Sequence, residues 1–264
     1  MRPNLLPIAL ANTRFQLEGF LPRVLDREPE FQSFVAVGHF YRRLAIADLL
    51  LSGDPPGFYE HLGHSARATL HALENVAPGD ALTSKCHSFL DAVASRDTTG
   101  AERIARLAPR SPDERREYEE DFLYVHILMG LYAELEDFDP LGAVERYEEL
   151  AADGEDERLP VCKALVERDQ DALGEALHGA IDAMAEKTKK AREEDALDPD
   201  AAVTTAYVSI DLLAWVELAT RLDLHVEPSY PLAPAAARAF HRLSPLSPDG
   251  WKTLGGVDED AERA

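Results

Sequence analysis

Residues 29–52 read PEFQSFVAVGHFYRRLAIADLLLS, and this stretch decides the fold class. Its apolar residues recur every three or four positions, which is the period of an α-helix. One face carries Phe31, Phe34, Gly38, Tyr41, Ala45 and Leu49, and a second face carries Val37, Phe40, Leu44 and Leu51. Because a helix that is apolar on two faces must be covered on both, we expect this helix to lie between other helices.

Two later stretches, 112–136 and 199–223, show the same two-faced pattern. In the first, the apolar positions are Tyr118, Phe122, Val125, Met129 and Tyr132, backed by Leu128, Leu131 and Leu135. In the second, one side carries Val208, Leu212, Trp215, Ala219 and Leu222, and another carries Val203, Tyr207, Ile210 and Leu213. We predict that these two helices and the helix at 29–52 are the central ones of the fold.

Turn chemistry divides the rest of the chain into helices. Asp54-Pro55, Ser111-Pro112, Asp139-Pro140 and Asp198-Pro199 each place a good N-cap before a proline that suits the first helical position. Glu114 completes a capping box with Ser111, and no sustained alternation of apolar and polar residues indicates a strand. The sequence therefore predicts an all-α protein with helices at 5–25, 29–52, 55–76, 80–96, 98–108, 112–136, 140–152, 157–168, 170–195 and 199–223.

A weak internal repeat indicates how these helices are organised. Residues 89–97 resemble residues 161–169, and each copy ends in Arg-Asp before an alanine-bearing helix. Such a unit predicts a helical-hairpin array or a compact multi-helix domain derived from a repeat. We expect one helical domain over 1–224 and a proline-rich tail over 225–264 that packs on the helices. The expected anchors of the tail are Tyr230, Phe240 and Trp251, and its last residues, Val257–Ala264, are expected to be frayed.

Charge is unevenly distributed along the chain. The 264 residues carry 27 basic and 49 acidic side chains, a net charge of −22. Residues 1–110 hold 12 of each sign, so the whole excess lies in residues 111–264. Within that part, residues 111–160 hold 17 acids and 4 arginines. This balance argues against direct binding to nucleic acid, which needs a basic surface.

Other features of the composition suggest where the protein acts. No run approaches the roughly 20 apolar residues of a spanning helix, so no membrane association is expected. The short apolar run after Arg2 is interrupted by Pro7 and is a poor match to a secretory signal. Cys86 and Cys162 are the only cysteines, which implies no disulfide framework. We therefore expect a cytoplasmic protein in which both cysteines are small core residues.

The side chains that carry catalytic or metal chemistry form no recognised motif. His61, His64 and His71 share a helix face, but the metalloprotease order H-E-x-x-H is absent, and a polar helix face explains them better than a metal site. Asp48 and Asp211 each interrupt an apolar helix, and we expect them to be buried and paired with an arginine rather than catalytic. The candidate partners are Arg42, Arg43 and Arg67. The sequence thus predicts no catalytic residue, no metal ligand and no cofactor.

Several segments resemble one bacterial family. They are residues 11–15 (ANTRF), 27–31 (REPEF) and 37–44 (VGHFYRRL), together with the repeated unit that ends in Arg-Asp. Over roughly residues 10–225 the chain resembles the immunity protein 49 family of bacterial polymorphic toxin systems. The resemblance implies an all-helical cytosolic protein that protects the producer of a toxin by binding that toxin.

The leading hypothesis is therefore an immunity protein whose partner is a cognate toxin, with a basic nuclease domain as one candidate. An acidic surface accelerates association with a basic partner. The residues predicted to contact the partner are Glu117, Glu120, Asp121, Glu148 and Glu149, on two helices expected to pack together. Three alternatives stay open: the acids are only a solvated face, the protein is a helical-repeat adaptor for another protein or peptide, or it is an enzyme of unrecognised type. The oligomeric state is also open.

Overall fold

The computed structural model describes residues 5–26, 30–53, 55–77, 79–151, 156–239 and 246–254, and these residues form ten α-helices and no strand. The helices are α1 (Leu6–Leu25), α2 (Phe31–Ser52), α3 (Pro55–Asn75), α4 (Ser88–Ala94), α5 (Thr98–Leu107), α6 (Glu119–Ala133), α7 (Pro140–Ala151), α8 (Arg158–Glu167), α9 (Gln170–Glu193) and α10 (Ile210–Arg221). The described residues also form four short 3-10 helices, of which the first two lie between α-helices and the last two follow α10: η1 (Thr83–Lys85), η2 (Ala201–Val203), η3 (Ala235–Arg238) and η4 (Gly250–Lys252). The predicted all-α fold is confirmed.

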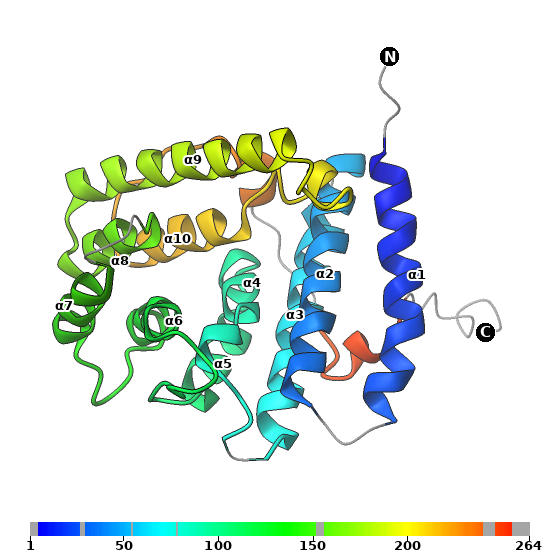
Figure 1. The fold of residues 1–264 in the computed structure, drawn as a ribbon, viewed down its shortest axis with the longest axis horizontal. Helices are drawn as coiled ribbons and strands as arrows, with labels where there is room; N and C mark the ends of the chain where they lie inside the picture. The colour runs from blue at the N-terminus through cyan, green and yellow to red at the C-terminus, as the bar shows by residue number, and fades with distance from the viewer. Residues whose placement is uncertain are drawn as a thin grey trace.

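Most helices pack against their neighbours in the chain. The helices α1, α2 and α3 lie side by side at one end of the molecule (Figure 1). Next, α3 contacts α4 and α5, α5 contacts α6, and α6, α7 and α8 follow in order. The long helix α9 packs on α8, and α10 then returns to pack on α4 (Figure 1). This order also brings α6 into contact with α8, which positions the site described below.

The three helices predicted to be central are buried on more than one face. On α2, Tyr41 and Leu44 are inaccessible to solvent, as is Val125 on α6. Trp215 on α10 is also buried, and its indole Nε1 donates a hydrogen bond to the hydroxyl of Tyr124 on α6 at 3.0 Å. A buried tryptophan needs such a partner for its N–H group. The bond therefore fixes the position of α10 against α6, and the buried indole ring packs between the two helices.

The helix predicted at 112–136 begins later, at Glu119, so its predicted start is wrong. Asp113 instead forms a local turn, because its carboxylate accepts hydrogen bonds from the Arg115 N–H at 3.0 Å and from Arg116 Nε at 2.7 Å. Aspartate side chains compete with helical hydrogen bonds in this way. Tyr118, which was expected to face the core, therefore precedes the helix and is 74 % exposed.

Two other predicted helices also begin later than expected, at Ser88 rather than 80 and at Ile210 rather than 199. The carboxylate of Asp198 accepts from the backbone N–H groups of residues 200 and 201, but this cap starts only the short η2. The cap of α10 is Ser209, whose hydroxyl accepts from the Leu212 N–H at 3.2 Å. Tyr207 consequently lies outside the helix and is 55 % exposed, and on α2 the predicted apolar position Leu51 is 40 % exposed.

The two repeated Arg-Asp pairs have the same local structure. Arg96 and Arg168 both adopt a left-handed backbone, with φ of 59° and 54°, and each ends a helix. Asp97 then caps α5 by accepting from the Gly100 N–H at 3.0 Å, and Asp169 caps α9 by accepting from the Ala172 N–H at 3.0 Å. Each pair is thus a compact joint that stops one helix and starts the next.

The described part of the tail contacts the first helices. Trp251 is fully buried, its ring packs edge-on against Phe34 of α2 at 5.7 Å between centroids, and its carbonyl oxygen accepts from the Tyr41 hydroxyl at 2.5 Å. Tyr230 is also buried. Two further predictions, the anchor Phe240 and the frayed segment Val257–Ala264, lie outside the described residues.

The buried carboxylate of the core is Asp91, so the predictions for Asp48 and Asp211 need correction. Asp48 is 30 % exposed and lies 3.8 Å from Nε2 of His61. Asp211 is 37 % exposed, and its Oδ1 lies 4.0 Å from Nη1 of Arg42. Asp48 lies near the C-terminal end of α2 and Asp211 is the second residue of α10, so each side chain keeps part of its surface exposed, although Oδ1 of Asp211 is itself buried. The other two candidate arginines, Arg43 and Arg67, pair with Asp198 and Asp97.

Asp91 is only 1 % exposed and joins α2, α3 and α4. Arg42 Nε lies 2.6 Å from its Oδ1, and the Ser65 hydroxyl donates to its Oδ2 at 2.5 Å. Ser65 also lies within hydrogen-bond distance of the Ser88 hydroxyl, at 2.8 Å. Gly38 allows this close approach, because a Cβ there would lie 2.7 Å from the Ser88 oxygen. The network therefore depends on a glycine that the sequence pattern had only placed on an apolar face.

Candidate functional site

The five acids predicted to bind a partner do not all lie on one surface. Glu117 precedes α6, and its carboxylate accepts hydrogen bonds from the backbone N–H groups of Ser84 at 2.9 Å and Asp113 at 3.0 Å. These bonds hold the segment before α6 against η1. The Glu117 carboxylate is therefore engaged within the fold, and Glu117 does not lie on α6 with Asp121, although the sequence predicted both on one helix.

Asp121 belongs to a charged cluster where α6 meets α8. Its Oδ1 accepts from Arg158 Nη1 at 2.8 Å, while Arg158 Nη2 bonds Asp156 Oδ2 at 2.6 Å. The Tyr147 hydroxyl of α7 also donates to Asp156 Oδ2, at 2.5 Å. The Arg158 guanidinium lies over the ring of Tyr124, 4.8 Å from its centroid. Arg158 thus joins α8 to α6 by charge-assisted hydrogen bonds, and Asp156 links this pair to α7 through Tyr147.

This arrangement keeps Asp156 ionised. Burial raises the pKa of its carboxyl, but hydrogen bonds from Arg158 and Tyr147 outweigh that effect and lower the pKa to about 2. Burial lowers the pKa of Arg158, but its bonds to the carboxylates of Asp156 and Asp121 outweigh that effect and raise the pKa above its usual value. Since the folded-state pKa of Asp156 lies below its unfolded value, the stabilisation is present above about pH 4 and is lost as the pH falls toward 2.

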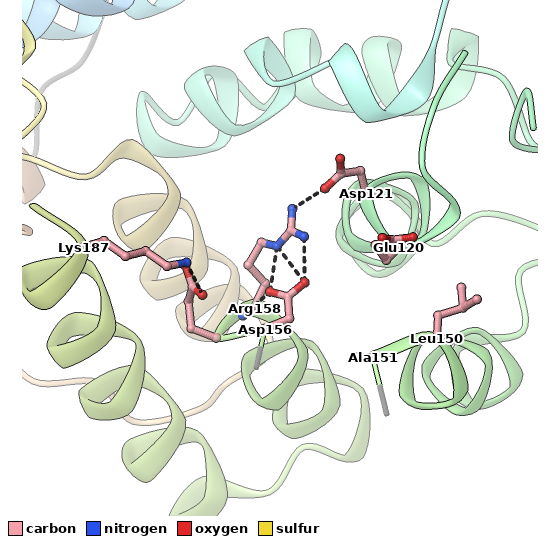
Figure 2. A pocket seen from close by; sticks show the side chains of 8 residues that line it. Glu120, Asp121, Leu150, Ala151, Asp156, Arg158 and Lys187 are labelled. Carbon is pink, nitrogen blue, oxygen red and sulfur yellow. Dashed lines mark hydrogen bonds and ion pairs between the residues drawn. The ribbon is translucent and has the colours of Figure 1, made fainter. Parts of the chain in front are cut away.

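A pocket of about 460 Å³ opens beside this cluster (Figure 2). Its charged lining consists of the carboxylates of Glu120, Asp121, Asp156 and Glu157 and the cations of Arg158 and Lys187. Figure 2 shows Arg158 between Asp121 and Asp156, with Glu120 separate from these pairs. Lys187 of α9 reaches across to Glu157, with Nζ 2.6 Å from Oε2. Four carboxylates facing two cations leave the pocket with a negative charge.

Glu148 and Glu149 lie on α7, and both have partners within the chain. Lys163 Nζ lies 2.6 Å from Oε1 of Glu148. Arg146 Nη1 lies 3.0 Å from Oε2 of Glu149, and the same guanidinium makes two bonds of 2.9 Å to Glu119 of α6. The expected packing of α7 against α6 is confirmed. Their acidic faces meet through Arg146, which offsets part of their charge.

Of the five predicted acids, only Glu120 forms no ion pair or hydrogen bond with another described residue that would occupy its carboxylate. Exposed ion pairs contribute little to stability and are screened by salt, so Glu149 remains available to a partner. Asp121 and Glu117 are held by the fold. Among these five acids, the carboxylates least engaged within the chain are Glu120 at the rim of the pocket and Glu149 on the exposed side of α7.

The comparison with protein families decides the identity of the chain. A family model described as Immunity protein 49 matches residues 61–237, more than half of the sequence. The chain belongs to the immunity protein 49 family. The matched range runs from α3 to η3 and includes both Asp91 and the acidic pocket, whereas α1 and α2 precede it. No curated protein and no solved structure matches the chain.

Three residues that line the pocket of this immunity protein, Asp156, Arg158 and Lys187, were not predicted from the sequence. Asp156 and Arg158 carry a local signal, since the Asp156 carboxylate accepts from the Arg158 N–H at 3.0 Å in an Asx turn that starts α8. Lys187 carries no such signal, because it lies 30 residues from Glu157 in the sequence. Within the described ranges, no helix is long and apolar enough to cross a membrane.

The helix face that carries His61, His64 and His71 is partly buried. His61 Nε2 lies 3.8 Å from Asp48 Oδ2, His64 Nε2 lies 3.6 Å from Glu60 Oε1, and His71 packs against the Trp251 ring at 5.3 Å between centroids. Across the part of the chain that the structure describes, no three His, Cys, Asp or Glu side chains form a group that could hold a metal ion. Cys86 and Cys162 are both buried, as predicted, and burial raises the pKa of each thiol.

Burial of the histidines predicts a loss of stability in mild acid. Burial lowers the pKa of His61 to about 4, with smaller contributions from the charges of His64 and Arg14. Unfolded histidine titrates near about 6.5, so the unfolded chain binds the proton first as the pH falls. Lowering the pH from about 7 to about 5 should therefore reduce the free energy of unfolding by about 2 kcal/mol through His61.

Urea unfolding at several pH values tests this expectation. The variant His61→Phe keeps an aromatic ring beside Tyr41, which lies 6.1 Å away between centroids, and removes the titrating group. Its stability should depend less steeply on pH than that of the wild type. An unchanged slope between pH values of about 7 and 5 would contradict the assignment.

Proposed function

We propose that this protein neutralises a cognate bacterial toxin by binding it directly in the cytoplasm of the cell that produces the toxin. The observation that carries the proposal is membership of the immunity protein 49 family. The chain also offers an acidic pocket beside α6 and a net charge of −22 that lies wholly in residues 111–264. Both features suit a protein that binds a basic partner rapidly.

The proposed partner surface is the rim of the acidic pocket together with the exposed side of α7. Glu120 supplies a carboxylate without an intrachain ion pair, and Glu149 is 69 % exposed. Tyr118 stands just before Glu120 and is 74 % exposed, and tyrosines are common anchors of protein interfaces. A toxin with a basic cleft, such as a nuclease domain, is the partner that this combination fits best.

A second function is supported by the shared structure of the two Arg-Asp joints. Helical units that repeat in this way also build adaptors that hold peptides or partner helices. An adaptor would bind its partner without changing the activity of a toxin. The measurement that separates the two roles is therefore toxin activity in the presence of the protein, not binding alone.

The test uses a candidate toxin domain from the neighbouring genes, because an immunity gene is expected to lie beside the gene of its toxin. Co-expression with that domain should restore growth, and the two proteins should co-purify as a complex of fixed stoichiometry. In a titration, the toxin activity should fall in proportion to added protein and end at equivalence, because a binding inhibitor acts stoichiometrically. Protection by amounts far below equivalence would indicate an enzyme instead, and binding without loss of activity would indicate an adaptor.

A further inference from the structure

A second hollow lies between α8 and α9 and is continuous with the acidic pocket. Its volume is about 730 Å³, and it shares Asp156, Glu157 and Lys187 with that pocket. The floor is made of small apolar side chains, namely Ala164 of α8 and Ala172, Ala176, Gly179, Ala180 and Ala183 of α9. We refer to this hollow as the α8–α9 groove.

Gly179 shows that the groove is open and not filled by the chain's own side chains. A Cβ at this position would meet no other atom within 4 Å. Glycine is the poorest helix former after proline, and Gly179 stands in the middle of the 24-residue α9. No close contact within the fold requires a glycine here. Its effect is to keep the floor of the groove low.

The groove is bounded at both ends. At one end, the Lys187 ammonium bridges to Glu157, with Nζ 2.7 Å from Oε1. At the other end, the joint at Arg168 and Asp169 turns the chain from α8 into α9. The ten residues of α8 span about 15 Å at the rise of an α-helix. The groove thus has the length of about three turns of a helix, and small side chains on its floor let another backbone approach closely.

The free charges on the rim are negative. Lys163 is paired with Glu148 at 2.6 Å, and Lys187 is paired with Glu157. Glu167 and Glu175 line the rim from α8 and α9, are exposed, and form no ion pair with a described residue. A helix that fills this groove would therefore need an apolar face with lysine or arginine on each side of it.

We propose that the α8–α9 groove receives a basic amphipathic helix of the cognate toxin. The inference rests on the proposed function, because it takes the toxin as the partner, and it adds how that partner is held. An amphipathic helix in an apolar groove is a common mode of recognition, in which the apolar face supplies affinity and flanking charges supply orientation. Continuity with the acidic pocket makes the two hollows one interface.

The experiment fills the groove without disturbing the core. Gly179→Trp places an indole in open space, and the control Gly179→Ala adds only a methyl group there. Titration calorimetry with the candidate toxin domain should show binding at least about tenfold weaker for Gly179→Trp and within about twofold of wild type for Gly179→Ala. The helical circular dichroism and the unfolding temperature of both variants should equal or exceed those of the wild type. Wild-type affinity in the correctly folded Gly179→Trp variant would overturn the proposal.

A designed peptide makes the outcome independent of the toxin. The probe is a fluorescein-labelled helix of about 14 residues with leucine on one face and lysine on the flanks, and its counterpart carries glutamate in place of lysine. The lysine peptide should bind the wild type saturably, the glutamate peptide should not, and Glu167→Gln with Glu175→Gln should weaken the lysine peptide. The proposed binding at the groove would be refuted if the wild type bound both peptides equally well. It would also be refuted if the lysine peptide bound Gly179→Trp as tightly as it binds the wild type. If the wild type binds the lysine peptide but not the toxin domain, the proposed function fails while the groove stands.

Discussion

Replacing Asp91 with alanine is expected to lower the free energy of unfolding by about 3–5 kcal/mol, the largest effect of any single change considered for this protein. Asp91 is 1 % exposed and accepts hydrogen bonds from Arg42 and Ser65. Its removal leaves the Arg42 guanidinium, which is 16 % exposed, without its nearest counter-ion in the core. The other carboxylate near Arg42 is Asp211, and it lies 4.0 Å away. A buried charge that loses its partner is far more costly than a lost surface pair.

Urea unfolding of a small set of variants measures this effect. The single change Ser65→Ala should cost about 1–2 kcal/mol, because it removes the hydrogen bonds of Ser65 with Asp91 and Ser88 but leaves the ion pair. The double change Arg42→Met with Asp91→Leu should recover much of the loss, because both charges are then absent. Asp80→Ala serves as the surface control, since Asp80 is 57 % exposed. If Asp91→Ala and Asp80→Ala were equally stable, the Asp91 network would have no structural role.

Reversing the two available acids of the proposed partner surface, with Glu120→Lys and Glu149→Lys, should slow association with the toxin domain by about 10- to 100-fold at low ionic strength. The change adds four units of positive charge where a basic partner would approach. Because such steering acts through solvent, salt screens it. The difference in association rate between the variant and the wild type should therefore shrink as the ionic strength rises above about 0.1 M, where the Debye length is about 10 Å. Stopped-flow association rates across a salt series give this dependence directly.

The matched control carries the same change of charge on α1 and at its C-cap, with Glu18→Lys and Asp26→Lys. Both acids are exposed, form no ion pair with a described residue, and lie outside the range matched by the family. This control should slow association by much less, because its charges are far from the proposed surface. Equal rates for the two variants at every salt concentration would mean that the acids beside α6 and α7 are only a solvated face. Glu117, Asp121 and Glu148 are left unchanged, because their reversal would break bonds of the fold.

The positions of the helices follow from sequence where the signal is local. Asp97 and Asp169 cap the helices that begin just after them, and both Arg-Asp joints have the predicted likeness because a left-handed residue and a capping carboxylate act within one turn. The same reasoning was wrong at Ser111 and Pro112. There the Asp113 carboxylate accepts from the Arg115 N–H in a local turn, and the Glu117 carboxylate accepts from the N–H groups of Asp113 and of Ser84 in η1. A capping motif cannot predict those bonds.

The candidate site could be predicted only in part from the sequence, because its charge pairs also join residues that are distant along the chain. Acidic residues cluster between 111 and 160, and their number alone indicates a charged surface. Whether each carboxylate is free depends on cations such as Lys187, which reaches the pocket from α9 across 30 residues of sequence. The same holds for Asp91, whose partner Arg42 is 49 residues away on another helix. Pairing is a property of the packed helices.

The sequence by itself determined the all-α fold class, the three central helices and the joints between helices, because helical period and capping depend on residues within a few positions of one another. The tertiary structure alone decided which carboxylate is buried, which acids are paired within the chain, and where the surface is hollow. Those properties arise where α6 meets α8 and where α8 packs on α9, because these contacts bring together side chains that no local pattern relates. Burial and charge pairing depend on distance in space, and only the packed chain sets that distance.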